Sequence, residues 1–161
     1  MAILVCYGRV YCNPDDRLSH QKIPISHASS LFLIGSFGAS SVLIFATPNV
    51  PYAQPGNLLG AYLISALIGV RIAQYVDFPV EFQAALVVSL SILFMLVSNT
   101  VHPAGRATGL IAVMGHDEVD EMGYHFLLQP VLSGLLIMLV IALLFNNLSS
   151  NYERHYPRHW W

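Results

Sequence analysis

The stretch that decides the fold is LLIMLVIALLF, from Leu135 to Phe145, which is apolar on every side. A helix on the surface of a soluble protein needs a polar stripe that faces water, and this stretch has none. It lies inside a longer segment, from Met122 to Tyr152, that contains no Asp, Glu, Lys or Arg. About 20 mostly apolar residues are enough to cross the hydrocarbon core of a bilayer as a helix. We therefore predict a transmembrane helix at Phe126–Asn147.

The rest of the chain has the same character. Hydrophobic residues make up 55% and charged residues 10% of the 161 residues, whereas soluble domains carry about 25% charged residues. Two further segments, Ala28–Val70 and Phe82–Gly105, contain no charged residue. Their lengths predict helices near Ala28–Ala46, Leu58–Val76 and Phe82–Thr100. The expected fold is all-α, an integral membrane helical bundle of about four transmembrane helices in a lipid bilayer.

This pattern divides the chain into three parts. A polar N-terminal segment (1–27) precedes the membrane domain (28–148), and a polar and aromatic tail (149–161) follows it. Within the membrane domain, Ala107–Gly115 is apolar but too short to span a bilayer, and it follows Pro103 and Gly105. We expect a re-entrant short helix there, which needs other protein or a wet cavity around its backbone. The alternative is a long third helix that is broken at Pro103.

The basic residues predict an orientation. With four transmembrane helices, all but one of the seven Lys and Arg residues lie on one side of the membrane: Arg9, Arg17, Lys22, Arg71, Arg154 and Arg158. Because basic residues favour the cytoplasmic side, we expect both termini in the cytosol, matrix or stroma. The membrane would be an organellar inner membrane, mitochondrial or plastid, or a bacterial inner membrane.

A weak internal repeat links two small-residue segments. Ala39–Ile44 resembles Ala107–Ala112, and each segment is followed by a Gln-Pro pair that opens a long helix, at Gln54 and Gln129. In a four-helix topology the two units would run in the same direction, as in some transporters whose sites lie at the repeat interface. Chance similarity among small residues is the alternative.

Two groups of residues are candidates for a functional site. The first is Gly35–Ser41 (GSFGASS), where small side chains favour close helix packing, and where the alternative is that the Ser36, Ser40 and Ser41 hydroxyls line a polar path. The second group is His102, Arg106 and Thr108. Ionisable residues at membrane depth are functional candidates, and the planar guanidinium of Arg106 suits a planar anion. The alternative is that Arg106 extends to the membrane surface and pairs with an acidic residue.

Other classes of function have little support. There is no basic run that would bind nucleic acid, and neither the histidines nor Cys6 and Cys12 have the spacing of metal ligands or of a redox pair. No Ser-His, Cys-His, HExxH or paired-carboxylate arrangement lies at membrane depth. We therefore expect no catalytic residue, cofactor, metal site or nucleic-acid partner, and no enzyme activity.

Several motifs in the same order resemble the HPP family of small integral membrane proteins. They are GSFGASS, AQPGN at Ala53–Asn57, VHPAGRATGLIAVMG at Val101–Gly115, and the segment from FLLQP to LLFNN at Phe126–Asn147. The resemblance covers about residues 30 to 148. It implies tandem helical units and a role in nitrite transport of the kind proposed for plastids and cyanobacteria. It also adds two residues of AQPGN to the candidate pathway for a small inorganic anion, which then comprises Ser36, Ser40, Gln54, Asn57, His102, Arg106 and Thr108.

The chain also departs from the family pattern. Ala104 stands where the second proline of the His-Pro-Pro motif is expected, Arg106 stands where a small residue is usual, and no spanning run precedes GSFGASS. These departures raise a second hypothesis. The chain would be an accessory subunit of a large respiratory or photosynthetic membrane complex, with other membrane subunits as partners, and a homo-oligomer is the remaining possibility.

Overall fold

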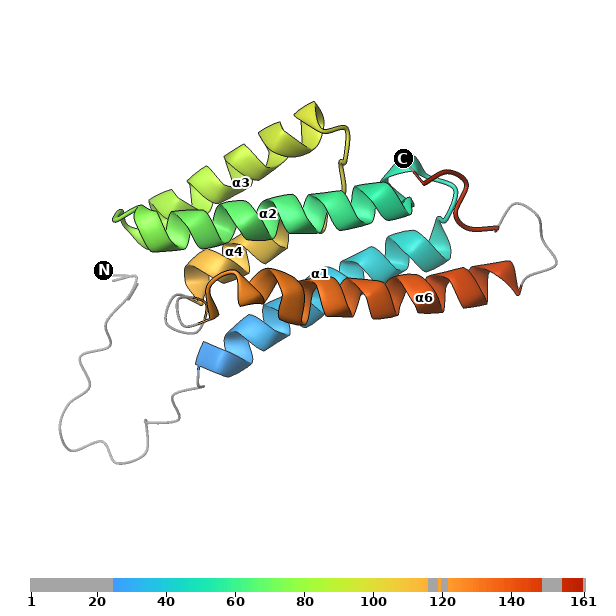
Figure 1. The fold of residues 1–161 in the computed structure, drawn as a ribbon, viewed down its shortest axis with the longest axis horizontal. Coiled ribbons are helices and arrows are strands. Elements are labelled where there is room, and N and C mark those ends of the chain that lie inside the picture. Colours follow the sequence, from blue (N-terminus) through green and yellow to red (C-terminus); the bar gives the residue numbers. More distant parts are fainter. Residues whose placement is uncertain (1–24, 116–118, 120–121, 149–154, 161) are drawn as a thin grey trace, which may run out of the picture.

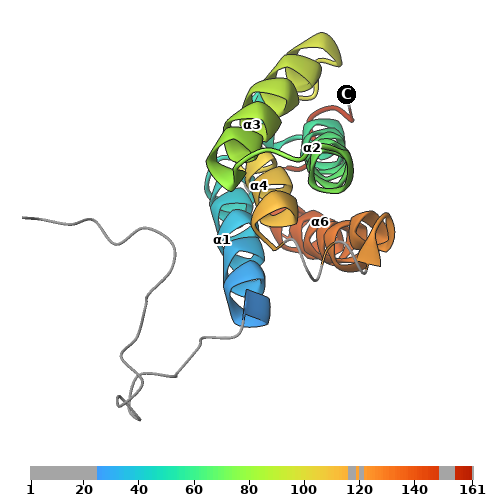
Figure 2. The same ribbon diagram turned by 90° about the vertical axis from the view of Figure 1, so that its left-hand side faces the viewer.

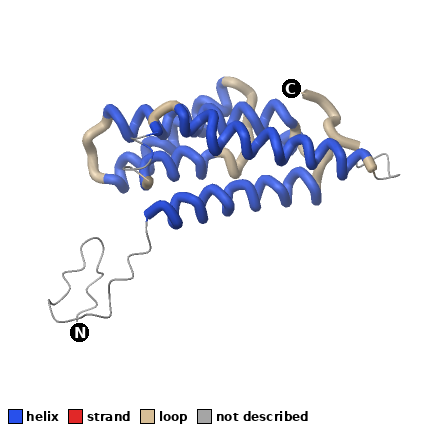
Figure 3. Tube along the Cα trace, turned by 60° about the horizontal axis from the view of Figure 1, so that its bottom comes forward, coloured by secondary structure: helices blue, strands red, loops and turns tan. Residues whose placement is uncertain are grey.

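The computed structural model describes residues 25–115, 119, 122–148 and 155–160, and within them the chain forms helices and loops and no strand (Figures 1 and 3). The elements are, in order, α1 (Ile25–Ala46), η1 (Pro51–Ala53), α2 (Pro55–Tyr75), α3 (Val80–Val97), α4 (Arg106–Met114), η2 (Leu127–Leu132) and α6 (Ser133–Asn147). The predicted all-α membrane bundle is confirmed, and the helix boundaries lie within one turn of the predicted ones.

Three helical segments are long and apolar enough to cross a membrane: Pro55–Tyr75, Val80–Val97 and Leu127–Asn147. The apolar part of α1, Gly35–Ala46, is shorter. The whole of α1 has 22 residues, which corresponds to a length of about 33 Å at 1.5 Å per residue. The bundle is thus built from three spans and α1, and the short helix α4 lies where the sequence predicts one. The expected re-entrant path is not observed, because the chain that leaves α3 near Gly105 reaches the opposite end of α2 at Gly123.

A local motif explains why α3 ends where it does. Asn99 has a φ of 55°, in the left-handed region that commonly terminates helices. The Thr100 amide donates to the Met95 carbonyl oxygen at 2.9 Å, and the Asn99 amide donates to the Leu96 carbonyl oxygen at 3.3 Å. This pair of bonds satisfies the last carbonyl groups of the helix and turns the chain away. A third helix that is merely kinked at Pro103 is therefore excluded.

After this turn, α4 runs back through the bundle parallel to α2. Contacts advance together along the two helices: Ala61 meets Gly105, Gly69 meets Ala112, and Gln74 meets Gly123 beyond the end of α4. We name the two ends of the bundle by residues near them. The His102 end comprises residues 47–54, 98–105 and 155–160, and the Asp77 end comprises residues 76–79 and 122–126. The chain from Gly105 to Gly123 therefore leads from the His102 end to the Asp77 end (Figure 1).

This return changes the direction of the last helix. Gly134 packs on Phe37, and the Asn146 side-chain amide donates to the Ile44 carbonyl oxygen at 3.1 Å. Both α1 and α6 thus run from the Asp77 end to the His102 end. The predicted long helices are present, but α6 runs in the same direction as α1 and not in the opposite one, because the chain lies at the His102 end at residues 98–105 and at the Asp77 end at residues 122–126. The described chain begins at one end of the bundle and finishes at the other, and the placement of both termini on one side stays a prediction.

Two further expectations depended on the expected directions of the helices. The basic residues do not gather at one end, since Arg71 lies over the Tyr75 and Tyr124 rings at the Asp77 end and Arg158 bonds to Asn49 at the His102 end. The two units of the weak repeat, α1–α2 and α4–α6, run in opposite directions, so the expected parallel sense is wrong. The repeat itself stays a prediction.

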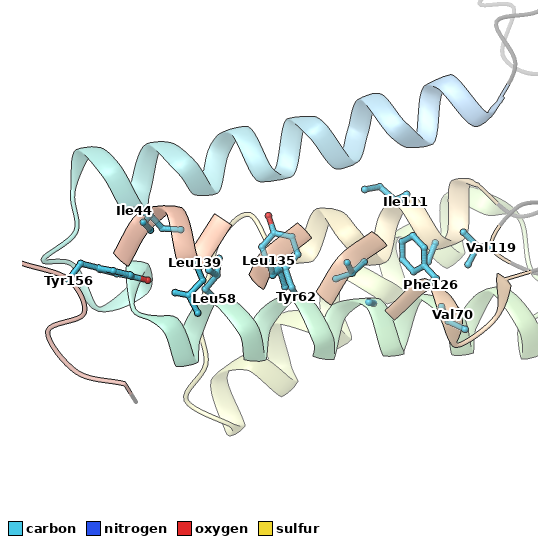
Figure 4. Packing of buried hydrophobic residues seen from close by; sticks show 14 residues of the cluster. Ile44, Leu58, Tyr62, Val70, Ile111, Val119, Phe126, Leu135, Leu139 and Tyr156 are labelled. Carbon is cyan, nitrogen blue, oxygen red and sulfur yellow. The ribbon is translucent and has the colours of Figure 1, made fainter. Parts of the chain in front are cut away.

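The core lies where α1, α2, α4 and α6 meet. In the end view α4 occupies the centre, with α1, α2 and α3 around it (Figure 2). Figure 4 shows the main apolar cluster, whose fully buried members include Ile44, Leu58, Tyr62, Val70 and Leu135. Helices α2 and α4 approach closely because glycines face each other, and a Cβ on Gly69 would lie 2.6 Å from the Gly109 carbonyl oxygen. This is the small-residue packing typical of membrane helices.

Some predicted features lie outside the described residues. They are residues 1–24 with Cys6, Cys12 and three of the basic residues, the acidic residues at 117, 118, 120 and 121, and residues 149–154 with Arg154.

Candidate functional site

Four buried polar side chains meet near the His102 end. Ser36 and Ser40 from α1, Tyr62 from α2 and His102 from the α3–α4 connection are all 4% exposed or less. The Ser40 hydroxyl lies 2.8 Å from the Tyr62 hydroxyl and 2.6 Å from His102 Nε2, and Tyr62 also hydrogen-bonds Ser36. We call these four residues the His102 cluster. In Figure 4 the Tyr62 hydroxyl is directed toward α1, where the two serines lie.

The partners of His102 determine where its proton lies. His102 Nδ1 is 2.6 Å from the Tyr52 carbonyl oxygen, which can only accept, so Nδ1 carries a proton and donates it. In the neutral ring Nε2 is then the acceptor and the Ser40 hydroxyl donates to it. Ser40 accepts in turn from the Tyr62 hydroxyl. The cluster is therefore a directed row of hydrogen bonds that ends at Nε2 of His102.

Aromatic packing holds the same residues in place. The Tyr62 ring is stacked on Phe37 at a centroid distance of 5.5 Å, and its centroid is 5.9 Å from that of His102. Burial in the α3–α4 connection lowers the pKa of His102 below its ordinary value, and the bond to the Tyr52 carbonyl oxygen partly opposes this shift. The ring is thus held in its neutral form at pH 7.

A small cavity adjoins His102. Its volume is about 80 Å³, and its lining combines His102 and Arg106 with mostly apolar residues: Ile92, Met95, Leu96, Val101 and Pro103. Arg106 is an exposed residue at the start of α4. The tertiary structure thus brings together His102, Arg106 and the two α1 serines, which the sequence analysis selected separately. The surface that this cavity exposes is almost entirely apolar, because both ring nitrogens of His102 are bonded to Tyr52 and Ser40.

A second polar group lies deeper, where α2, α3 and α4 meet. The Ser91 hydroxyl is 3.1 Å from the Ser65 hydroxyl, which donates to the Arg106 carbonyl oxygen at 3.2 Å. The Gly109 amide donates to the Ser65 hydroxyl at 3.2 Å. Thr108 is fully buried on α4 and its hydroxyl has no hydrogen-bond partner. We call Ser65, Ser91 and Thr108 the mid-bundle hydroxyls.

The Asp77 end has a larger cavity of about 300 Å³, lined by Asp77, Phe78, Val80, Gln83, Val113 and Met114. Gln83 is buried, and its amide nitrogen donates to the Val76 and Phe78 carbonyl oxygens at 2.8 and 2.9 Å. Its side-chain oxygen has no partner. A polar acceptor is thus left over beside the cavity at this end.

Gln54 and Asn57 do not join this arrangement. The Gln54 amide nitrogen donates to Pro48 and Val50, its oxygen accepts from the Arg158 and His159 amides, and the Asn57 amide donates to the Pro51 carbonyl oxygen. Gln54 therefore fastens the C-terminal residues 155–160 to the loop before α2. The Trp160 carbonyl oxygen also caps the Gly56 amide, which belongs to the first turn of α2 and has no partner within the helix.

Four polar residues of these groups were not predicted from the sequence: Tyr62, Ser65, Ser91 and Gln83. A signal for two of them was present, because Gln83, Val87, Ser91 and Met95 recur every fourth residue and form the buried stripe of α3. A polar residue on the inner stripe of an otherwise apolar helix marks a polar interior. Tyr62 and Ser65 had no comparable signal, since their partners come from α1, α3 and α4.

Comparisons with known proteins identify the family. A model of the HPP transmembrane region matches residues 17–157. This chain belongs to the HPP family. Two transmembrane proteins of Dictyostelium discoideum are similar to it, one 48% identical over 113 residues and the other 41% identical over 128 residues. These matches cover 68% and 78% of this chain but 39% and 40% of the relatives, so the chain spans about two fifths of their length. No solved structure matches.

Membership confirms the resemblance drawn from the motifs and places the chain in a membrane. In this HPP-family chain the name motif reads His102, Pro103 and Ala104. His102 is its buried member, whereas Pro103 is exposed and Ala104 is half-buried. The histidine is held by Ser40 and Tyr52, so alanine in place of the second proline leaves these contacts intact.

Proposed function

We propose that this HPP-family protein moves a small inorganic anion of the nitrite type across the membrane, without enzymatic chemistry. The observation that carries the proposal is a set of buried polar side chains near the His102 cavity and at mid-bundle, with Gln83 buried beside the cavity at Asp77. A polar side chain is costly in the membrane interior unless it is paired, and such residues commonly mark substrate pathways.

The positions of these side chains follow α2 from one end to the other. The His102 cavity lies level with Gly60, which meets Thr100, and Ala61, which meets Gly105. Tyr62 and then Ser65 follow on α2, with Ser91 and the start of α4 beside Ser65. Gln83 lies farther along, at the Val76 carbonyl oxygen just after α2 ends, and the buried apolar residues Ile72, Val87 and Val113 separate it from the mid-bundle hydroxyls. Polar groups thus occur at successive depths, and two of them, Thr108 and Gln83, retain an unused oxygen.

The charge at the His102 end supports an anion. Arg106 lines the cavity beside His102, and its guanidinium group offers paired donors to a planar oxyanion. Arg106 is also the first residue of α4, so the positive end of the helix dipole adds to the same region. The cavity of about 80 Å³ suits an ion of a few atoms. The supported function is therefore entry of a small anion at Arg106.

Reconstituted protein tests this proposal directly. Purified chain in sealed liposomes should take up nitrite faster than protein-free liposomes, and Arg106→Gln should lower the initial rate about tenfold, the effect of losing roughly 1.4 kcal/mol of anion stabilisation. Arg71→Gln is the matched control, because Arg71 lies at the Asp77 end over two tyrosine rings. Equal uptake with and without wild-type protein would refute the function. Equal uptake rates for the two variants would show that Arg106 has no specific role in the uptake of nitrite.

Extraction of the protein from its native membrane distinguishes a transporter from an accessory subunit. Gentle detergent extraction from the native membrane, followed by mass measurement, should yield a small homo-oligomer or monomer if the chain transports by itself. Recovery within a much larger complex, together with absent nitrite flux, would favour an accessory subunit.

A further inference from the structure

We infer that the anion is carried together with a proton, which is held at Nε2 of His102 and passed along the hydroxyl groups of Ser40, Tyr62 and Ser36. This inference rests on the proposed function and adds the coupling ion to it. It is drawn from the direction of the hydrogen bonds in the His102 cluster and from the charges around them.

The cluster can hold His102 in either charge state. When Nε2 is neutral, the Ser40 hydroxyl donates to it at 2.6 Å and accepts from Tyr62 at 2.8 Å. When Nε2 gains a proton, it donates to Ser40 instead, Ser40 donates to Tyr62, and Tyr62 donates to Ser36. Each hydroxyl can be donor or acceptor, so when Ser36 takes up a proton, each hydroxyl proton moves one place toward Nε2, and these transfers leave the row in the reverse direction. Nδ1 keeps its bond to the Tyr52 carbonyl oxygen in both states.

A protonated His102 ring needs a nearby anion to balance its positive charge, because the groups around it supply none. Among the described side chains, α1 contributes only the hydroxyls of Ser36 and Ser40, α2 contributes Tyr62, and α4 contributes Arg106, while α3 lines the cavity with apolar residues. The contact from the loop before α2 is a carbonyl group, that of Tyr52. No carboxylate faces the ring among these groups. A proton on His102 would therefore add a second positive charge beside Arg106 with no counter-charge.

An anion in the cavity supplies that counter-charge. His102 and Arg106 line the same space, so an anion bound there favours the charged ring, and the charged ring favours the anion by the same free energy. A monovalent anion and one proton then enter together as an electrically neutral pair. On release at the other side, Nε2 loses the proton, the anion leaves, and the row returns to its first direction.

The test measures proton and nitrite movement together in the same sealed liposomes, with a pH-sensitive dye inside and protein-free liposomes as the background. We expect inward nitrite flux to carry protons in equal numbers, and its rate to be unchanged when the membrane potential is clamped at zero or made negative inside. Tyr62→Phe keeps the ring stack but removes the hydroxyl, and it should abolish the proton movement. Ser41→Ala is the matched control, because the Ser41 hydroxyl bonds locally to the Gly38 carbonyl oxygen.

The outcomes separate this inference from the proposed function. Protein-dependent nitrite flux without proton movement, and with a rate that follows the membrane potential, would overturn the coupling and leave anion transport standing. The absence of protein-dependent nitrite flux would overturn both. Because the wild-type ratio of protons to nitrite decides the matter, the test does not depend on a variant that folds poorly.

Discussion

Two small-residue segments look alike in the sequence but make different kinds of contact in the bundle. Gly35–Ser41 lies in α1, and a Cβ added to Gly35 or Gly38 would meet nothing within 4 Å. Gly105–Gly109 opens α4, and a Cβ on Gly109 would lie 2.5 Å from Val87 and 2.7 Å from the Ser65 carbonyl oxygen. The glycines of the second segment permit backbone contact. In the first segment the serines make the contacts with the bundle, because Ser36 and Ser40 are buried and Ser40 bonds to Tyr62 and His102.

The difference shows how the two helices are attached. Helix α4 is fixed to α2 by close packing of backbones, which tolerates no added volume. Within the described side chains, α1 is held by the Ser40 bonds to Tyr62 and His102 and by the Asn146 bond to the Ile44 carbonyl oxygen. No described part of this chain packs on Gly35 or Gly38, whereas Ser36 and Ser40 are buried in the bundle. Whether the segment serves for packing or as a polar path stays a prediction. We call the close contact between α2 and α4 the rigid seam, and the contact that α1 makes through these hydrogen bonds the hydrogen-bonded seam. The two adjoin at His102.

The largest expected effect comes from adding a methyl group to each seam. Gly109→Ala should lower the free energy of unfolding by about 3 kcal/mol, at the upper end of the range for overpacking, because one of the atoms it meets is a backbone oxygen. Gly38→Ala should raise stability by about 0.5 kcal/mol, since alanine is the better helix former. Thermal unfolding of the two variants in the same detergent measures the contrast. Equal Tm values would mean that the seams do not differ.

A smaller effect is expected from breaking the hydrogen-bonded seam. Ser40→Ala leaves Nε2 of His102 and the Tyr62 hydroxyl without their shared partner, at a cost of about 1–2 kcal/mol. Ser41→Ala removes only a local bond to Gly38 and should change stability by less than about 0.5 kcal/mol. Unfolding of both variants measured side by side compares the two serines. A Ser41 effect as large as that of Ser40 would contradict the attachment of α1 through the His102 cluster.

The smallest expected effect is a dependence on pH that only the hydrogen-bonded seam can have. Burial lowers the pKa of His102 in the folded protein, so below about pH 6.5 the unfolded chain binds this proton more readily. Stability should therefore be highest above that pH and fall as the pH decreases through it in nitrite-free buffer. The difference between wild type and His102→Asn, plotted against pH, isolates this contribution. A difference that is flat between pH 7.5 and about 5 would show that His102 does not respond.

The sequence predicted the helices well for a physical reason. Uncharged apolar segments such as Leu135–Phe145 have no stable place outside a bilayer or a core, and their length matches the membrane. Each helix can therefore be predicted from its own residues. The family motifs can likewise be recognised from short local stretches of sequence. The candidates His102, Arg106, Ser36 and Ser40 could also be selected locally, because polar residues in such a chain are few.

The path of the chain between helices could not be predicted in the same way. The direction of Ala107–Gly115 depends on Asn99, which has a left-handed backbone conformation. It also depends on Gly105 and Gly109, which pack against α2. These are contacts between segments distant in the sequence. The direction of α6 was not predicted, so the expected sense of the repeat was wrong, and the placement of the termini stays a prediction.

The sequence by itself thus determined that this protein resides in a membrane, which segments are helical, and to which family it belongs, because hydrophobicity and length act within each segment. Only the tertiary structure decided that α4 returns along α2, that His102 contacts Ser40 and Tyr62, and that it lines one cavity together with Arg106. Such a meeting depends on the packing of four helices against one another, and no single segment encodes it.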